Sequence, residues 1–242
     1  MFFLLYGGLH GYAFWKIRSA FFPGPVISVL VAAVMALMIV APALIRISER
    51  HGLEWTARIL SHAGYAWMGI LFLFAAFALA FDLCRLLVFL SGLVWRMEAV
   101  PFLLSARFAF FLPLFLALGI FVYGWFDARN IRIESLTIQT DKIPPETGRL
   151  RLVQISDIHI GLMNGPGFVS RMVRVIQEAG PDLLLSTGDL VDGQINSIEK
   201  VLPLFQELRP RLGKYAVTGN HEFYAGIAQA SEFTRKAGFQ ML

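Results

Sequence analysis

Three short blocks decide the fold of this chain: Asp-Ile-His at 157–159, Gly-Asp-Leu-Val-Asp at 188–192 and Gly-Asn-His-Glu at 219–222. Each block follows a short apolar run, and such runs, bounded by glycine and polar residues, are typical of buried strands. The blocks recur at intervals of about 30 residues, the length of one strand–helix–strand unit. We therefore expect successive parallel strands that carry the blocks at their carboxyl ends, where open α/β sheets place their sites.

The residue types in these blocks predict a metal site. Carboxylates, one amide oxygen and imidazoles form a ligand set that suits Mn²⁺, Fe or Zn²⁺. Gly188 and Gly219 stand directly before Asp189 and Asn220. Glycine is favoured there if the backbone turns tightly or approaches an ion closely. Any one block alone is a weak signal, but all three in order, each at a strand end, favour metal binding over ordinary loop caps.

The three blocks resemble the DxH, GDxxD and GNH[DE] motifs of the calcineurin-like metallophosphoesterase family, from residue 149 to the end of the chain. The resemblance implies two divalent metal ions. Asp157 and His159 would bind the first ion, Asp189 would bridge both and Asn220 would bind the second. His221 would face the scissile phosphate as a proton donor or charge stabiliser. Two such ions generate hydroxide at neutral pH and hold the attacking and leaving oxygens.

Two acidic residues of the blocks have supporting roles in this interpretation. We expect Asp192, which closes its block, to orient a metal ligand without binding the ion itself. We expect Glu222 to cap the following helix or to accept a hydrogen bond from a neighbour.

The chain also departs from the family pattern. The resemblance implies a later lone histidine and a GHxH block that complete both metal shells, yet no histidine follows His221. Another strand is expected to begin near 238–239, just before the chain ends at Leu242. We therefore expect an α/β domain of the α/β/β/α-sandwich type that is truncated after about its first half, and a chain that is inactive as given.

The composition separates two halves. Hydrophobic residues make up 57% of the chain, which includes 22 Phe, and this excess lies before Asp127. We predict a membrane region at 1–126, a strand and linker at 127–148 and the phosphoesterase part at 149–242. The single cysteine, Cys84, excludes an internal disulfide. The net charge of +4 comes from scattered residues, which favours lipid headgroups over nucleic acid as the partner.

Apolar segments predict a helical transmembrane region. The stretches 26–45, 65–81 and 108–126 carry no charge and are long enough to cross a bilayer. The stretch 86–95 extends the second of them. Residues 1–15 are apolar but short and form either a first span or an interfacial helix, so we expect three to four transmembrane helices.

Charged residues near the second span leave two interpretations open. Asp82 and Arg85 are three positions apart, which favours a salt bridge near the interface; the alternative is a pocket for a substrate or a lipid headgroup. Before this span, residues 53–60 read as a small surface helix with Glu54 and Arg58 paired.

The second half alternates between strands and helices. Apolar and polar residues partly alternate over 131–139, which predicts an edge strand. The predicted order from residue 150 is a strand to 155, a helix at 167–179, a strand at 183–186, a helix at 197–208, a strand at 214–217 and a helix at 226–237. Gly180 and Pro181 form a stop signal for the first of these helices.

Taken together, the sequence favours a membrane-anchored phosphoesterase that hydrolyses a phosphoester or pyrophosphate bond at a dinuclear metal site. Its location favours a phosphorylated lipid or a lipid-linked nucleotide as substrate. The alternatives are a membrane-tethered interaction or sensory module with an incomplete site, and a small transporter or channel with an appended domain. Slightly more Lys and Arg flank the spans on the side of the α/β domain, which places a multi-pass protein in the plasma (inner) membrane with that domain in the cytoplasm. The sequence sets no oligomeric state.

Overall fold

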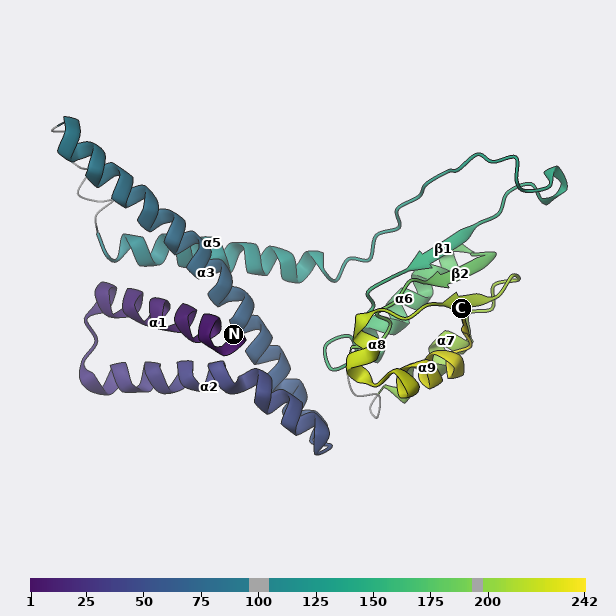
Figure 1. Cartoon of the computed structure of the whole chain (residues 1–242), viewed down its shortest axis with the longest axis horizontal. Coiled ribbons are helices and arrows are strands. Elements are labelled where there is room, and N and C mark those ends of the chain that lie inside the picture. Colours follow the sequence, from purple (N-terminus) through teal and green to yellow (C-terminus); the bar gives the residue numbers. More distant parts are fainter. Residues whose placement is uncertain (96–104, 193–197) are drawn as a thin grey trace. The chain divides into compact units, whose positions relative to one another are not determined.

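The computed structural model of the chain describes residues 1–95, 105–192 and 198–242. The chain divides into two compact units, Met1–Asn130 and Ile131–Leu242 (Figure 1).

The first unit is helical. Its described elements are α1 (Phe2–Phe21), α2 (Pro25–Arg50), α3 (Glu54–Trp95) and α5 (Phe108–Asp127). Helix α1 ends where Phe22 adopts the left-handed conformation, and α2 starts with a proline at its first position after Gly24, both of which are ordinary helix punctuation. Helix α3 packs against the other three helices and is the central element of the unit (Figure 1).

Three helices of this unit are long and apolar enough to cross a membrane: Pro25–Arg50, the Glu54–Gly92 part of α3, and Phe108–Asp127. The three predicted spans are therefore confirmed by length and composition. Helix α3 continues through the predicted extension to residue 95, although its segment able to cross a membrane ends at Gly92. The separate surface helix predicted at 53–60 is wrong, because α3 runs through it without a break. Gly64 does not interrupt α3; it packs close to Ala41 of α2.

The second unit is an α/β domain with a parallel sheet, as predicted. Strands β1 (Leu152–Ile155), β2 (Leu183–Ser186), β3 (Lys214–Ala216) and β4 (Gln240–Met241) pair in chain order, and each pairing is parallel. The register places Ile155 beside Ser186 and Ser186 beside Ala216. The strands that precede the three blocks therefore end at the same edge of the sheet.

One face of this sheet carries the core of the unit. Ile155, Leu184 and Ala216 are buried on it together with residues from the helices. Helix α6 (Pro166–Ala179) turns Val169, Met172, Val173 and Ile176 into this core, the spacing of an amphipathic helix. It ends at Gly180, whose φ is 59°, so the predicted stop is confirmed.

The helices after β2 are shorter than predicted. Within the range predicted as one helix at 197–208, the structure has the 3₁₀ helix η3 (Glu199–Val201) followed by α7 (Leu202–Gln206). The first residue of that range lies outside the described residues. After β3, helix α8 (Asn220–Ala225) precedes α9 (Ile227–Lys236), and Gly226 separates them with a φ of 99°. A further 3₁₀ turn, η1 (Pro145–Thr147), lies ahead of β1.

The edge strand predicted over 131–139 is wrong: the structure assigns no strand to these residues. The apolar positions Ile131 and Ile133 are two apart, but Leu136 follows at a spacing of three. Side chains alternate faces along a strand, so this step moves the second apolar pair to the opposite face. Leu136 and Ile138 are 85% and 75% exposed, and no continuous apolar face forms.

A buried lysine ties the helix ends to the sheet. Lys214 of β3 is 8% exposed, and its Nζ donates to the carbonyl oxygens of Phe205 at 2.6 Å and Ala237 at 2.8 Å. These carbonyls lie at the ends of α7 and α9, where a cation is favourable. Burial, assisted by the charge of Arg209, lowers the pKa of Lys214 to about 8.

This pKa gives the second unit a pH-dependent stability. Between about pH 8 and about pH 10.5 the unfolded chain holds a proton on Lys214 that the folded chain has lost, so stability rises with pH across this window. The full shift would correspond to about 3 kcal/mol. Because two carbonyl hydrogen bonds hold the charged form, we expect a rise of about 1 kcal/mol relative to Lys214→Met.

The measurement is the urea unfolding midpoint of residues 131–242 within the full-length protein in detergent. Pulse proteolysis monitors the unfolding, at pH values below and above this window. Groups other than Lys214 titrate equally in both proteins, so their contribution cancels in the difference. Parallel pH profiles for wild type and Lys214→Met would contradict the prediction.

Candidate metal centre

The first two blocks lie side by side beyond the ends of their strands. Asp157 N–H donates to the Gly188 carbonyl at 3.2 Å, and His159 N–H donates to the Asp189 carbonyl at 3.0 Å. Ile160 N–H continues the series to the Leu190 carbonyl at 2.9 Å. The pairing of β1 with β2 is thus extended into the loops, and it fixes the first block against the second.

The third block is joined to the second through two glycines. A Cβ atom built on Gly188 would lie 2.8 Å from the Gly219 nitrogen, and one built on Gly219 would lie 2.2 Å from Asp189 Oδ1. The close approach at both glycines is to atoms of the neighbouring block, whereas the sequence suggests an approach to an ion. His221 N–H completes the join by donating to Asp189 Oδ1 at 2.8 Å.

The Glu222 carboxylate also connects the second and third blocks, through hydrogen bonds from their backbone N–H groups. It is 2% exposed. Its Oε2 accepts from Gly219 N–H at 2.8 Å and Asp189 N–H at 3.1 Å, and its Oε1 accepts from Leu190 N–H at 2.7 Å and, more weakly, Val191 N–H at 3.4 Å. The predicted helix cap is confirmed, because Gly219 is the N-cap of α8. The bonds to the 188–192 loop are additional, and they make one carboxylate the link between two blocks.

The side chains of the blocks converge at this edge. Two groups have ligand atoms within 4.8 Å of one another: Asp157, His159 and Asp189, and His159, Asp192 and His221. His159 belongs to both groups. The rings of His159 and His221 meet edge to face with centroids 4.4 Å apart.

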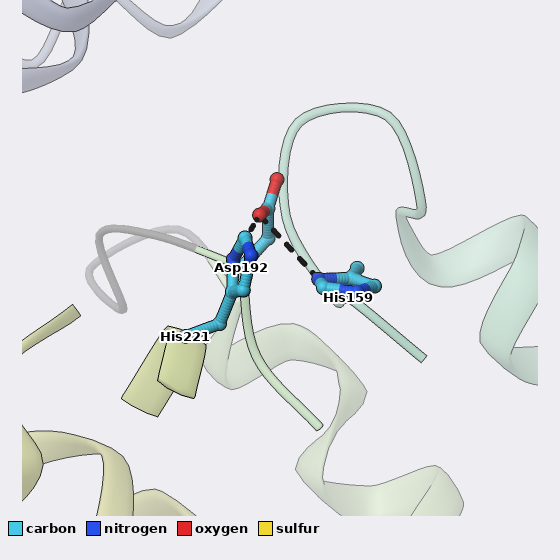
Figure 2. Close-up of side chains that lie close together, drawn as sticks. All are labelled: His159, Asp192 and His221. Atoms are coloured by element: carbon cyan, nitrogen blue, oxygen red, sulfur yellow. Dashed lines mark ion pairs between the residues drawn. The ribbon is translucent and has the colours of Figure 1, made fainter. Parts of the chain in front are cut away.

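Asp192 lies between the two histidines (Figure 2). Its Oδ1 is 2.9 Å from His221 Nδ1 and 3.5 Å from His159 Nδ1. The shorter contact is within ion-pair distance but does not meet hydrogen-bond geometry, and His221 Nδ1 is a buried nitrogen without a hydrogen-bond partner. Asp192 therefore contacts both rings, where it can orient them, and it belongs to one of the two groups that could hold an ion.

Three of these residues have strained backbones. Asp157, His159 and Asp189 have φ values of 54°, 49° and 51°, in the left-handed region that residues other than glycine adopt at a cost. Among the described residues, Phe22 is the one other non-glycine residue with positive φ. Such strain persists where the surroundings hold it, and it concentrates at functional sites.

The residues differ in exposure. Asp189 is 9% exposed, whereas the side chain of Asp157 is 67% exposed and accepts a hydrogen bond from Ser156 Oγ. The side chains of His159 and His221 are about one-third exposed. Asn220 is exposed at the first position of α8, between Gly219 and His221. The site is therefore open to solvent on one side and anchored by Asp189 on the other.

These residues fit a divalent metal ion. Carboxylate oxygens and imidazole nitrogens gather within a few ångströms, the donor set of Mn²⁺, Fe and Zn²⁺ sites. The buried His221 Nδ1 without a hydrogen-bond partner is a polar atom that would gain from a further neighbour. Asp157, His159 and Asp189 would hold an ion. Asp192 and His221 lie beside His159, where they would orient this ligand.

The fold and the site together define an α/β domain with candidate metal ligands at the carboxyl edge of its parallel sheet. Residues 150–239 match the family of calcineurin-like phosphoesterases. The second unit therefore contains a calcineurin-like metallophosphoesterase domain, a class that typically uses divalent metal ions.

Similar proteins include membrane proteins. The chain is 38% identical over 129 residues to an uncharacterized metallophosphoesterase of Aquifex aeolicus, which covers 53% of this chain and 49% of that protein. It is 33% identical over 123 residues to a transmembrane protein with metallophosphoesterase domain of Danio rerio, covering 50% and 28%. It is 30% identical over 151 residues to an uncharacterized metallophosphoesterase of Helicobacter pylori, covering 59% and 39%. The chain thus matches half or less of the length of these relatives.

Proposed function

We propose that this protein is a membrane-anchored, metal-dependent phosphoesterase that hydrolyses a phosphoester or pyrophosphate bond at a dinuclear site. The observation that carries the proposal is the convergence of the three blocks on Asp189. Its carbonyl accepts from His159, its carboxylate accepts from His221 N–H, and its own N–H is held by Glu222. Asp189 is therefore fixed at its carbonyl, its N–H and one carboxylate oxygen, and a ligand held this firmly is pre-organised for binding an ion.

In this proposal Asp157 and His159 hold the first ion, Asp189 bridges the two and Asn220 holds the second. Bound divalent ions of the Mn, Fe or Zn type would supply positive charge to the phosphate and hydroxide at neutral pH. Asp192, placed 2.9 Å from His221 Nδ1, orients the ring so that Nε2 is available to a phosphate oxygen or to the leaving group. A proton on that nitrogen stabilises the charge that develops there.

We infer the substrate class from the membrane anchor. The first unit carries three helices that are long and apolar enough to cross a membrane, so phosphorylated lipids and lipid-linked nucleotides are within reach of a tethered domain. The proposed location is the plasma (inner) membrane, with the phosphoesterase domain in the cytoplasm. Fold alone does not select a substrate, so the lipid assignment rests on the tether.

The test is hydrolysis of bis(p-nitrophenyl) phosphate by the full-length protein, meaning the product of the complete reading frame, in detergent before and after metal removal. We expect activity with Mn²⁺, its loss after chelation and gel filtration, and its return when Mn²⁺ is added but not when Mg²⁺ is added, because imidazole ligands favour Mn²⁺ over Mg²⁺. Metal content measured on the same samples should follow the activity. Absence of both bound metal and hydrolysis would favour a tethered interaction module.

A further inference from the structure

Helix α1 buries polar residues and exposes apolar ones, the reverse of a helix in a water-soluble protein. The residues it buries include His10 and Lys16, together with Tyr6, Ala13 and Ala20. Most of its exposed large side chains are apolar: Phe2, Phe3, Leu4, Leu5, Trp15 and Phe21 are between 46% and 82% exposed. The charged Arg18 is also exposed, and it lies in the last turn of the helix. Water favours the opposite arrangement, with apolar residues inside and polar residues outside.

Three polar residues of α1, namely His10, Tyr12 and Lys16, contact α3. Trp67 Nε1 donates to His10 Nε2 at 2.9 Å, and His10 Nδ1 lies 2.8 Å from the Tyr6 carbonyl. Nearer the other end, Asp82 of α3 accepts from Lys16 Nζ at 2.5 Å and from Tyr12 O–H at 2.7 Å. Lys16 is 3% exposed. These groups satisfy one another within the unit, which is what polar groups in a hydrocarbon environment require.

The dimensions also fit a bilayer. Helix α1 has 20 residues, and at 1.5 Å per residue it is about as long as the hydrocarbon core is thick. It packs against α2, α3 and α5, each of which contains a segment able to cross a membrane. Its apolar surface is therefore continuous with theirs.

We propose that α1 crosses the bilayer as a fourth membrane helix with its exposed apolar face against lipid acyl chains, and that the Lys16–Asp82 ion pair lies inside the membrane and holds it there. Helix α1 is not among the helices identified by length and composition. Its hydropathy is lowered by His10 and Lys16, which are buried, and by Arg18, which lies in its last turn. Asp82, half-buried in the unit, then pairs with a charge in α1 as well as with Arg85 at 3.4 Å.

Cysteine accessibility in native membranes tests the crossing. In a background with Cys84, the single cysteine, replaced by serine, cysteines are placed at Phe2, Gly11 and Gly24. A Cβ at Gly11 or Gly24 meets no atom within 4 Å, so neither substitution disturbs packing. We expect a membrane-impermeant maleimide to label positions 2 and 24 from opposite sides and to leave position 11 unlabelled until the membrane is dissolved. Labelling of position 11 in intact membranes, or of both ends from one side, overturns the proposal.

The ion pair is tested with the Gly11→Cys reporter. Asp82→Leu leaves Lys16 without its carboxylate, and we expect position 11 to become labelled. The double variant Lys16→Leu, Asp82→Leu removes both charges and should restore protection. Tyr12→Phe is the matched control: it removes a hydrogen bond to Asp82 but no charge and should stay protected. If the double variant is labelled as strongly as Asp82→Leu, the pair is not what holds α1.

Discussion

Asp189→Asn is expected to lower Mn²⁺-dependent phosphodiesterase activity by about 100-fold or more, since loss of a group beyond the ligands already costs 10- to 100-fold at metal sites. The asparagine keeps the size of the side chain and one oxygen, so the Oδ1 contact to His221 N–H at 2.8 Å can persist. What is lost is the negative charge that two proposed ions would share. The fold should therefore survive while the metal is released.

The readouts are hydrolysis of bis(p-nitrophenyl) phosphate and metal content, both on full-length protein in detergent. Asp141→Asn is the matched control, because it makes the same chemical change at an exposed residue outside the site. Its activity and metal content should equal those of the wild type. Full activity in Asp189→Asn would mean that the reaction takes place elsewhere in the protein.

Gly219→Ala provides an independent route to the same result. It changes no charge and no ligand, and the φ of −102° at this position is acceptable for alanine. The added methyl group would nevertheless overlap Asp189 Oδ1, at 2.2 Å, so the carboxylate must move. Gly165→Ala, at a position where a Cβ meets no atom within 4 Å, is the control for a glycine-to-alanine change at a helix N-cap.

Most of the fold could be predicted from the sequence because its signals are local. Short apolar runs before each block defined β1, β2 and β3, and a helix between successive strands implied parallel pairing, as observed. Three uncharged stretches defined the spans. The failures arose where several local signals competed: residues 53–60 read as a separate helix although nothing breaks α3, and residues 131–139 read as a strand although their apolar spacing changes from two to three.

The site was predictable in residue type but not in geometry. The motifs named Asp157, His159 and Asp189, and the structure brings them together. Their left-handed backbone conformations could not be foreseen, because aspartate and histidine adopt this region only where tertiary contacts impose it. The position of Asp192 against both histidines depends on how two loops pair, which a spacing of three residues within one block does not encode.

Glu222→Gln is expected to destabilise the second unit by about 2–3 kcal/mol and to weaken metal binding by about 10- to 100-fold. The two oxygens of Glu222 accept hydrogen bonds from four backbone N–H groups. A glutamine offers one oxygen, and its NH₂ group must face N–H donors on the other side. Because Glu222 is buried, with 2% of its surface exposed, the backbone N–H groups that face the glutamine NH₂ have no water to replace the lost acceptor.

The two effects can be separated in one set of samples. Urea midpoints of residues 131–242 by pulse proteolysis, without metal, report stability, and Mn²⁺ titration of the folded protein reports the site. Glu207→Gln, an exposed position at the end of α7, is the matched control and should change neither. A stability loss with unchanged Mn²⁺ affinity would make Glu222 a folding residue only. Loss of both, in a protein that keeps every proposed metal ligand, would mean that the backbone of the 188–192 loop must be held in place for Asp189 to bind the metal.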